Sequence, residues 1–337
     1  MKLADDALTV KGLTKIFNKH LVAVDHVDFA VKEGEIFGFL GPNGAGKTTT
    51  INMLITVLRP TEGNATVCGF DISKHAKDVR TCIGVVPQEY TADEDLTGLE
   101  NILLCADLYG IPREVSRKRS EELLELIELT KFKDKQVQTY SGGMRRRLEL
   151  ACGLINRPHV FFLDEPTLGL DVQTREATWN YIKLLKKEYG MTVFMTTHYL
   201  EEADMLCDRI AIIDHGKIVI TGTPNELKES LGGDIMSLTI KDADADVSGV
   251  IEKVPRVKEV KKQEGTYRIK LEEGEETAPT VLDAVRAAGH SVTRLSLTKP
   301  TLDEVYLEYT GKTLREEEGS RDAVFRQRVT MRRARGG

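Results

Sequence analysis

The chain has 337 residues, of which 41% are hydrophobic and 30% are charged, a balance typical of folded proteins and unlike that of disordered chains. Its net charge of −6 disfavours nucleic-acid binding over the whole surface, so no nucleic-acid partner is expected. The longest stretch without Asp, Glu, Lys or Arg covers twelve residues, 189–200, whereas a membrane span needs about 20 apolar residues. We therefore expect no membrane span.

Short apolar runs alternate with helical patterns over the first 220 residues. The runs are continuous rather than alternating, which predicts strands of a sheet covered on both faces. Helical patterns such as residues 172–187 separate them, so we predict an α/β core with parallel strands. The predicted strands are 36–40, 83–86, 160–163, 192–195 and 210–213.

A glycine-rich segment follows the first of these runs. Residues 41–48 match the pattern G-x-x-x-x-G-K-[ST], and a helical pattern over 49–58 follows them. The glycines let backbone N–H groups turn toward phosphate oxygens, and the helix N-terminus adds a positive dipole end. Lys47 would reach the β and γ phosphates, and the Thr48 hydroxyl would ligate Mg²⁺. The predicted phosphate loop consists of Gly41, Pro42, Asn43, Gly44, Ala45, Gly46, Lys47, Thr48 and Thr49.

From about residue 97 to 155 the alternation stops and the pattern is nearly all helical. We interpret this segment as a helical subdomain inserted into the α/β core, with an amphipathic helix over 120–129 capped by Ser120. Near its end, Ser141 precedes Gly142 and Gly143 and is predicted to cap a helix running to about Asn156. The Ser141 hydroxyl and the two glycine N–H groups could donate to a phosphate.

The next apolar run ends in two carboxylates, Asp164 and Glu165. At the C-terminal edge of a parallel sheet, these acids would lie where nucleotides bind in open α/β folds. Asp164 would hold Mg²⁺, largely through water, and Glu165 would orient or deprotonate the attacking water. Acids at a strand end often only cap the following turn. The phosphate loop about 118 residues upstream favours the metal site.

The character of the sequence changes near Asn225. The predicted order is β-α-β-β-α-β, that of a small ferredoxin-like unit, followed by a helix over 302–309. Leu302, Val305, Tyr306 and Tyr309 recur at helical spacing and predict a packing face on that last helix. The predicted strands are 235–241, 256–263, 266–272 and 291–298, and the predicted helices are 246–254 and 278–288.

Three domains follow from these patterns. Residues 1–224 form the predicted nucleotide-binding domain, with the helical subdomain at about 97–155. Residues 225–311 form a small accessory α+β domain. Residues 312–337 form a charged, partly disordered tail, whose arginines are either solvated or contact anionic lipid.

In its phosphate loop, acidic strand end and Tyr140-Ser141-Gly142-Gly143-Met144 segment, the chain resembles the ATP-binding cassette (ABC) family of P-loop NTPases, whose signature usually reads LSGGQ. Tyr140 and Met144 depart from that form, whereas the serine and both glycines match it. The resemblance covers residues 8 to about 224. It implies ATP and Mg²⁺ as cofactors.

The resemblance also implies roles for further residues. Gln88 matches the glutamine that reaches the metal and the lytic water, and His198 matches the switch histidine that contacts the γ-phosphate. Phe17 matches the aromatic residue that stacks on adenine, and residues 169–171 match a loop that crosses to the partner subunit. Without the ordered series of motifs, His198 or Phe17 alone would be interpreted as structural. The implied catalytic residues are Glu165, His198 and Gln88, and the implied metal ligands are Thr48, Gln88 and Asp164.

One phosphate loop and one signature per chain imply two copies. In the family the signature serine faces the nucleotide of the opposite subunit, so ATP would hold a homodimer together and hydrolysis would open it. Without a span of its own, the chain would drive a separate transmembrane permease, received near residues 88–108. Membrane contact would then be peripheral, at the cytoplasmic face of the cell membrane.

Residues 140–147 and 302–307 resemble the daunorubicin- or multidrug-resistance-type subset of these proteins. That resemblance implies an ATP-hydrolysing exporter subunit for drug or lipid-like cargo. A permease-free cassette ATPase acting in assembly, repair or translation is the alternative, although translation-type members usually carry two cassettes. A regulatory GTPase would need an N-K-x-D motif, which the sequence lacks.

Overall fold

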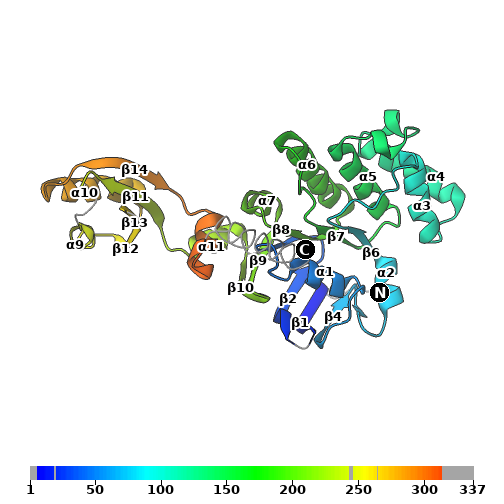
Figure 1. Ribbon diagram of the computed structural model, residues 1–337, viewed down its shortest axis with the longest axis horizontal. Coiled ribbons are helices and arrows are strands. Elements are labelled where there is room, and N and C mark those ends of the chain that lie inside the picture. The colour runs from blue at the N-terminus through cyan, green and yellow to red at the C-terminus, as the bar shows by residue number, and fades with distance from the viewer. Residues whose placement is uncertain (1–5, 19, 243–245, 264, 313–337) are drawn as a thin grey trace, which may run out of the picture. The chain divides into compact units, whose positions relative to one another are not determined.

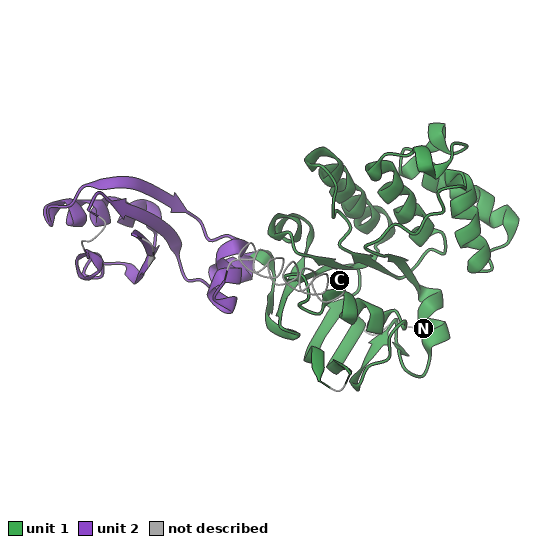
Figure 2. Ribbon diagram, viewed as in Figure 1, with its two compact units in different colours: residues 1–224, 314–337 green, residues 225–313 purple. Residues whose placement is uncertain are grey.

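The computed structural model describes residues 6–18, 20–242, 246–263 and 265–312. The described chain divides into two compact units, one ending at Pro224 and the other beginning at Asn225 (Figure 2). From residue 313 on, the tail predicted at 312–337 lies outside the described residues. No helix within the described ranges is long and apolar enough to cross a membrane.

The first unit is built on a six-stranded sheet with strand order β10-β9-β3-β8-β7-β6 (Figure 1). All neighbouring strands pair in parallel except the edge strand β10, which is antiparallel to β9. Every residue of β3 and β7 is buried, as continuous apolar runs require. The predicted parallel α/β core is confirmed. Its strands are β3 (Ile36–Leu40), β6 (Ile83–Val86), β7 (Val160–Asp164), β8 (Thr192–Thr197), β9 (Arg209–Asp214) and β10 (Lys217–Gly222).

A second sheet, antiparallel and of order β2-β1-β4-β5, was not predicted. In β2, buried Val27, Phe29 and Val31 alternate with less buried neighbours, so this strand has one face toward the core and one toward solvent. Such alternation differs from the continuous runs that marked the parallel strands. The sheet consists of β1 (Asp6–Phe17), β2 (Leu21–Lys32), β4 (Glu62–Val67) and β5 (Phe70–Asp71).

A cluster of phenylalanines joins the two sheets. Phe29 of β2 packs against Phe37, Phe39 and Phe194 of the parallel sheet, with ring centroids 5.5–5.8 Å apart. Helix α1 (Lys47–Leu54) adds the buried side chains of Ile51, Met53 and Leu54 to the same core. This packing fixes the end of β3 relative to the start of α1, and so the loop between them.

The helical subdomain lies between β6 and β7 in the chain and has its own core, which includes Ile102, Leu124 and Leu148. The predicted helix 120–129 is wrong in its bounds: α4 begins at Arg113, and Ser120 is buried in its interior. The Ser120 hydroxyl bonds the Ser116 carbonyl at 2.7 Å instead of capping a helix. The helices are α3 (Gly98–Leu108), α4 (Arg113–Leu126), two 3₁₀ turns (Thr130–Phe132 and Val137–Thr139) and α5 (Gly142–Leu154).

Three further helices belong to the first unit before the chain passes to the second. α2 (Ala76–Cys82) precedes β6, and α6 (Val172–Tyr189) and α7 (Leu200–Leu206) flank β8 along the chain. α8 begins at Pro224 and ends at Glu229.

The second unit is a four-stranded antiparallel sheet of order β12-β13-β11-β14 with two helices in its connections. This is the predicted β-α-β-β-α-β order, with the fourth strand beside the first. The first helix is shorter than predicted and the second begins four residues earlier. The elements are β11 (Asp234–Ile240), α9 (Ser248–Ile251), β12 (Val257–Gln263), β13 (Thr266–Leu271), α10 (Gly274–Ala287) and β14 (Val292–Thr298).

The last helix, α11 (Leu302–Thr310), begins with a capping box between Thr301 and Glu304. Leu302, Val305 and Tyr306 are buried, whereas Tyr309 is 39% exposed. The predicted packing face is therefore limited to the first three residues. Acidic side chains on α11 contact the neighbouring sheet: Glu304 pairs with Arg268 at 3.1 Å, and Glu308 pairs with Lys270 at 3.4 Å.

Candidate nucleotide-binding and hydrolysis site

The loop between β3 and α1 has a conformation that its glycines require. A Cβ atom on Gly41 would lie 2.2 Å from the Ile213 carbonyl oxygen, and one on Gly46 would lie 2.5 Å from that of Ala23. Gly46 also has a φ of 109°, which side chains rarely allow. The loop therefore follows the tight path that turns backbone N–H groups toward a bound anion at the N-terminus of α1.

Lys47 folds back over this loop and is 4% exposed. Its Nζ donates to the carbonyl oxygens of Gly41 and Pro42 at 2.7 and 3.2 Å. The same Nζ lies 3.0 Å from Oε1 of Glu165. The cation of the phosphate loop and the predicted base of the acidic strand thus meet in one site.

Thr196 orients both acids at the end of β7. Its hydroxyl donates to Asp164 Oδ1 at 2.5 Å and accepts a hydrogen bond from the Glu165 N–H at 3.0 Å. The parallel pairing of β7 and β8 places Thr196 directly beside Asp164. The sequence analysis missed Thr196, although polar residues at the end of an otherwise apolar strand were a usable signal.

The pKa values of the two acids shift in opposite directions. Burial raises the pKa of Asp164, and hydrogen bonds from Thr196 and Thr48 offset only part of this effect. Burial also acts to raise the pKa of Glu165, but the His198 hydrogen bond and the Lys47 charge outweigh it and lower that pKa to about 2. Glu165 is therefore a carboxylate at neutral pH.

His198 completes this cluster from the end of β8. Its Nδ1 lies 2.9 Å from Oε2 of Glu165, so the carboxylate contacts Lys47 on one oxygen and His198 on the other. Glu165 has a φ of 48°, in the left-handed region that a glutamate seldom adopts. Backbone strain of this kind is typical of functional sites in which the surroundings hold a side chain in place.

The oxygen donors needed for Mg²⁺ are present. The Thr48 hydroxyl lies near enough to the Asp164 carboxylate to lower its pKa, and Mg²⁺ prefers such hard oxygen ligands. Gln88 follows β6 and is exposed. Within the described ranges no group of three His, Cys, Asp or Glu residues could hold a metal.

The signature residues form a separate surface. Ser141 caps α5 by accepting a hydrogen bond from the Met144 N–H at 3.3 Å, as predicted. A Cβ atom on Gly143 would lie 2.4 Å from Cγ2 of Thr174, and Asp171 caps α6 through the Thr174 N–H at 3.0 Å. Among the described residues, no hydrogen bond or ion pair connects residues 141–143 with the phosphate loop. The signature and residues 169–171 therefore lie together on neighbouring helix N-termini.

Phe17 ends β1 and is only partly buried. It pairs across the hairpin with Leu21, which is 63% exposed, and Lys15 Nζ lies 5.3 Å from its ring centroid. The partly exposed Phe17 ring beside Leu21 offers an apolar surface on which an adenine ring could stack. Its role stays a prediction.

Two buried charged residues of α5 were missed by the sequence analysis. Arg146 and Glu149 are 1% and 3% exposed, and their side chains form an ion pair at 3.2 Å. Arg146 lies within a run of three arginines, which looks uniformly solvated. Its spacing of four and eight residues from Leu150 and Leu154 was the available signal, because these positions share one helix face.

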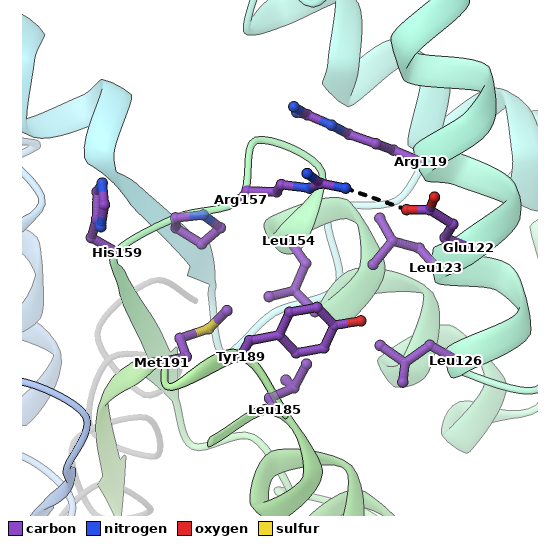
Figure 3. A pocket seen from close by; sticks show the side chains of 11 residues that line it. Arg119, Glu122, Leu123, Leu126, Leu154, Arg157, His159, Leu185, Tyr189 and Met191 are labelled. Atoms are coloured by element: carbon purple, nitrogen blue, oxygen red, sulfur yellow. Dashed lines mark hydrogen bonds and ion pairs between the residues drawn. The ribbon is translucent and has the colours of Figure 1, made fainter. Parts of the chain in front are cut away.

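A cavity of about 310 Å³ lies at the other end of α5 and α6 (Figure 3). Leucines line it, and an ion pair between Arg157 and Glu122 lies at its edge. It shares no residue with the nucleotide motifs, so it is not part of the site described above. The lining includes Leu123, Leu126, Leu154, Leu185, Tyr189 and Met191.

Comparisons with known proteins match both units. The family described as "ABC transporter" matches residues 24–168, and "ATP-binding protein DrrA1-3-like, C-terminal domain" matches residues 222–310. The chain is 41% identical to "Doxorubicin resistance ATP-binding protein DrrA" of Mycobacterium tuberculosis, over 92% of this chain and 95% of that protein. It is 36% identical to "Linearmycin resistance ATP-binding protein LnrL" of Bacillus subtilis, over 92% of this chain and all of that protein.

Solved structures agree with the fold of the first unit. CbiO1 of Clostridium perfringens, described as part of an ABC transporter complex, superposes with a TM-score of 0.62 at 27% identity, over 66% of this chain and 91% of that chain. The dimeric cassette MJ0796 bound to ADP and Pi superposes with a TM-score of 0.58 at 29% identity, over 64% of this chain and 98% of that one. Sequence, fold and site agree: the chain belongs to the ABC transporter family of ATP-binding proteins, with a DrrA1-3-like C-terminal domain.

Proposed function

We propose that this ATPase is the energy-supplying subunit of an exporter, working as an ATP-dependent homodimer with a separate transmembrane permease. The observation that carries the proposal is the joined cluster of Lys47, Glu165 and His198 at the mouth of the phosphate loop. Hydrolysis of a phosphoanhydride needs a cation that binds phosphate and a carboxylate that accepts a proton from water. It also benefits from a residue that holds this carboxylate in place, which here is the histidine.

In the proposed mechanism, Lys47 binds the β and γ phosphates. Thr48, Gln88 and Asp164 would hold Mg²⁺, which would supply positive charge to neutralise the phosphates. While Lys47 and His198 contact Glu165, its pKa of about 2 makes it a weak base. Once Lys47 contacts phosphate instead, Glu165 loses a neighbouring positive charge and becomes more basic. Glu165 then accepts the proton of the attacking water, and His198 contacts the γ-phosphate side of the site.

The separate signature surface supports a composite site. Ser141, Gly142 and Gly143 would contact the nucleotide held by the phosphate loop of the second copy, so two chains form two sites. Dimers are known for cassettes of this family, such as MJ0796. In this scheme the shared γ-phosphate holds the dimer closed, and its loss by hydrolysis permits opening.

The relatives' names support an exporter of drug or lipid-like cargo, since they are resistance ATP-binding proteins for doxorubicin, daunorubicin and linearmycin. We place the chain at the cytoplasmic face of the cell membrane, held there through its permease. The permease-free alternative finds no support among these relatives. Residues 1–224 would serve as the nucleotide-binding domain and residues 225–311 as an accessory domain.

The test is Glu165→Gln, which keeps the shape of the side chain but cannot accept a proton. We expect ATP binding to persist and kcat to fall by about 10²- to 10⁴-fold, the range of general-base catalysis. Steady-state phosphate release and fluorescent-nucleotide binding would be measured on the purified full chain. Glu201→Gln, an exposed glutamate on α7, is the matched control and should hydrolyse ATP normally. Normal turnover in Glu165→Gln would contradict its role as base.

A further inference from the structure

A charged pair is buried inside helix α5, the helix that begins at the signature serine. Arg146 and Glu149 are one turn apart, their side chains are 2% and 3% exposed, and they approach to 3.2 Å. Burying two charges is costly, and apolar side chains of similar size often stabilise a protein as well or better. Overall stability alone is therefore a weak reason for this pair.

The Arg146 guanidinium binds two loops of the nucleotide site at once. It donates to the Pro87 carbonyl at 2.7 Å and to the Gln88 carbonyl at 3.4 Å, both in the loop after β6. It also donates to the Glu165 carbonyl at 3.0 Å and to the Pro166 carbonyl at 2.7 Å, directly after β7. One side chain thus connects the glutamine loop, the backbone of the catalytic carboxylate and the signature helix.

Glu149 holds the far end of the same loop. Its carboxylate accepts hydrogen bonds from the N–H groups of Thr91 and Ala92, the latter at 3.2 Å, and from the Thr91 hydroxyl. Between these anchors, the Tyr90 hydroxyl donates to the Gly142 carbonyl at 3.3 Å, within the signature itself. Residues 87, 88, 90, 91 and 92 are therefore all bound to α5.

The two flanking arginines have different partners. Arg145 contacts Glu94 and the Gln138 carbonyl, and Arg147 donates to the Ile127 carbonyl at 3.0 Å. Among the described contacts of this arginine run, only those of Arg146 reach residues 87–88 and 165–166. Of the three arginines, Arg146 is therefore the one that connects these two loops to α5.

We propose that Arg146 and Glu149 form a positioning latch that fixes residues 87–92 and the backbone at 165–166 to the signature helix. A displacement of residues 87–92 is thereby passed to Ser141 and Glu165 of the same chain. The latch rests on the proposed function in one respect, namely that this loop faces the permease. It also holds Glu165 in its left-handed backbone conformation, because two of its four carbonyl partners are Glu165 and the next residue.

The test compares Arg146→Met, Arg146→Lys and Glu149→Gln in the purified full chain. Because Lys47 and Thr48 are unchanged, ATP affinity should stay within about two-fold, whereas kcat should fall about 10- to 100-fold in Arg146→Met through misplacement of Glu165. Arg146→Lys keeps the charge and some donors, so it should recover part of kcat. Hydrogen exchange of the amides at 88–92 should be faster in Arg146→Met and Glu149→Gln than in the wild type.

The matched control is Leu148→Ala, since Leu148 is fully buried on the same helix but lies in the core of the helical subdomain. It should lose stability yet keep kcat within about two-fold and leave exchange at 88–92 unchanged. If kcat instead falls in proportion to lost stability across all variants, or if exchange at 88–92 does not change in Arg146→Met and Glu149→Gln, the latch is wrong.

Should Arg146→Met fail to fold, Arg146→Lys and Glu149→Gln decide the question by the same two measurements. Failure of the proposed function gives a different result. In that case Glu165→Gln would retain turnover, while the exchange protection at 88–92 and its dependence on Arg146 would remain.

Discussion

At the scale of single residues, the site is organised around one carboxylate with two positively charged or hydrogen-bonding neighbours. Glu165 is 4% exposed and contacts Lys47 and His198 on opposite oxygens. Its pKa, lowered to about 2, means that the folded chain binds the ionised carboxylate far more strongly than the protonated acid. The same contacts that prepare the site for phosphate thus also stabilise the fold.

This coupling predicts a dependence of stability on pH. A carboxylate with a lowered pKa stabilises the fold above its unfolded pKa, near 4.5, and loses that contribution as pH falls toward 2. The contribution amounts to about 3 kcal/mol at neutral pH, from about 1.4 kcal/mol per unit of pKa. Urea unfolding at pH 6 and pH 3, followed by fluorescence of Trp179, should show a smaller loss for Glu165→Gln than for the wild type.

Equal acid sensitivity in the two proteins would contradict the low pKa of Glu165. Glu201→Gln serves again as the control, because its carboxylate is exposed to solvent and its loss should leave the pH dependence as it is in the wild type.

At the scale of elements, the predictions that rested on continuous apolar runs and on ordered motifs agree with the structure. The five parallel strands, the Ser141 cap and the order of the second unit follow from local patterns that the structure retains. The antiparallel sheet was missed, because strands with one exposed face carry a weaker signal than buried ones. Helix α4 was misplaced, because Ser120 looks like a cap but finds its partner within the helix. The contacts of Arg146 with the two loops depend on tertiary structure, since its four carbonyl partners lie 19 to 59 residues away in the chain.

Helix α11 carries a prediction of its own. Val305 is fully buried, so Val305→Asp would place a carboxylate in an apolar contact and should destabilise the second unit by about 3 kcal/mol. ATP affinity should not change, because no nucleotide motif lies beyond residue 224. Circular dichroism would report the whole chain, whereas Trp179, the one tryptophan, reports the first unit alone.

Asp303→Asn is the matched control on α11, because Asp303 is exposed. If Val305→Asp unfolds at the same urea concentration as the wild type, the assignment of this helix face to a packed interior is wrong. A parallel fall in ATP affinity would show instead that the second unit supports the nucleotide site.

At the scale of the whole molecule, phosphate loop and signature form separate surfaces of one chain, which leads to a prediction about mixed dimers. Lys47→Ala removes the cation for phosphate, and Ser141→Arg blocks the opposing surface, so each variant alone should be inactive. Mixed in equal amounts, they can form dimers with one intact composite site. Phosphate release should then recover to about a quarter of the wild-type rate, for random pairing and independent sites.

The mixing experiment has two decisive controls. Lys47→Ala alone, at the total protein concentration of the mixture, should show no recovery of phosphate release, which excludes a concentration effect. Full activity of Ser141→Arg alone would contradict the composite site, because its damaged signature would then be dispensable.

The close approach of Gly143 to Thr174 has a consequence for how this surface can change in evolution. With only 2.4 Å available between a Cβ atom at position 143 and the Thr174 methyl group, no side chain fits at 143 unless position 174 shrinks or α6 shifts. A shift of α6 would carry Asp171, its cap, with it. The signature residues 141–143 and residues 169–171, which would both meet a second copy, therefore constrain each other's substitutions. The effects of substitutions at 143 and 174 on stability should be non-additive.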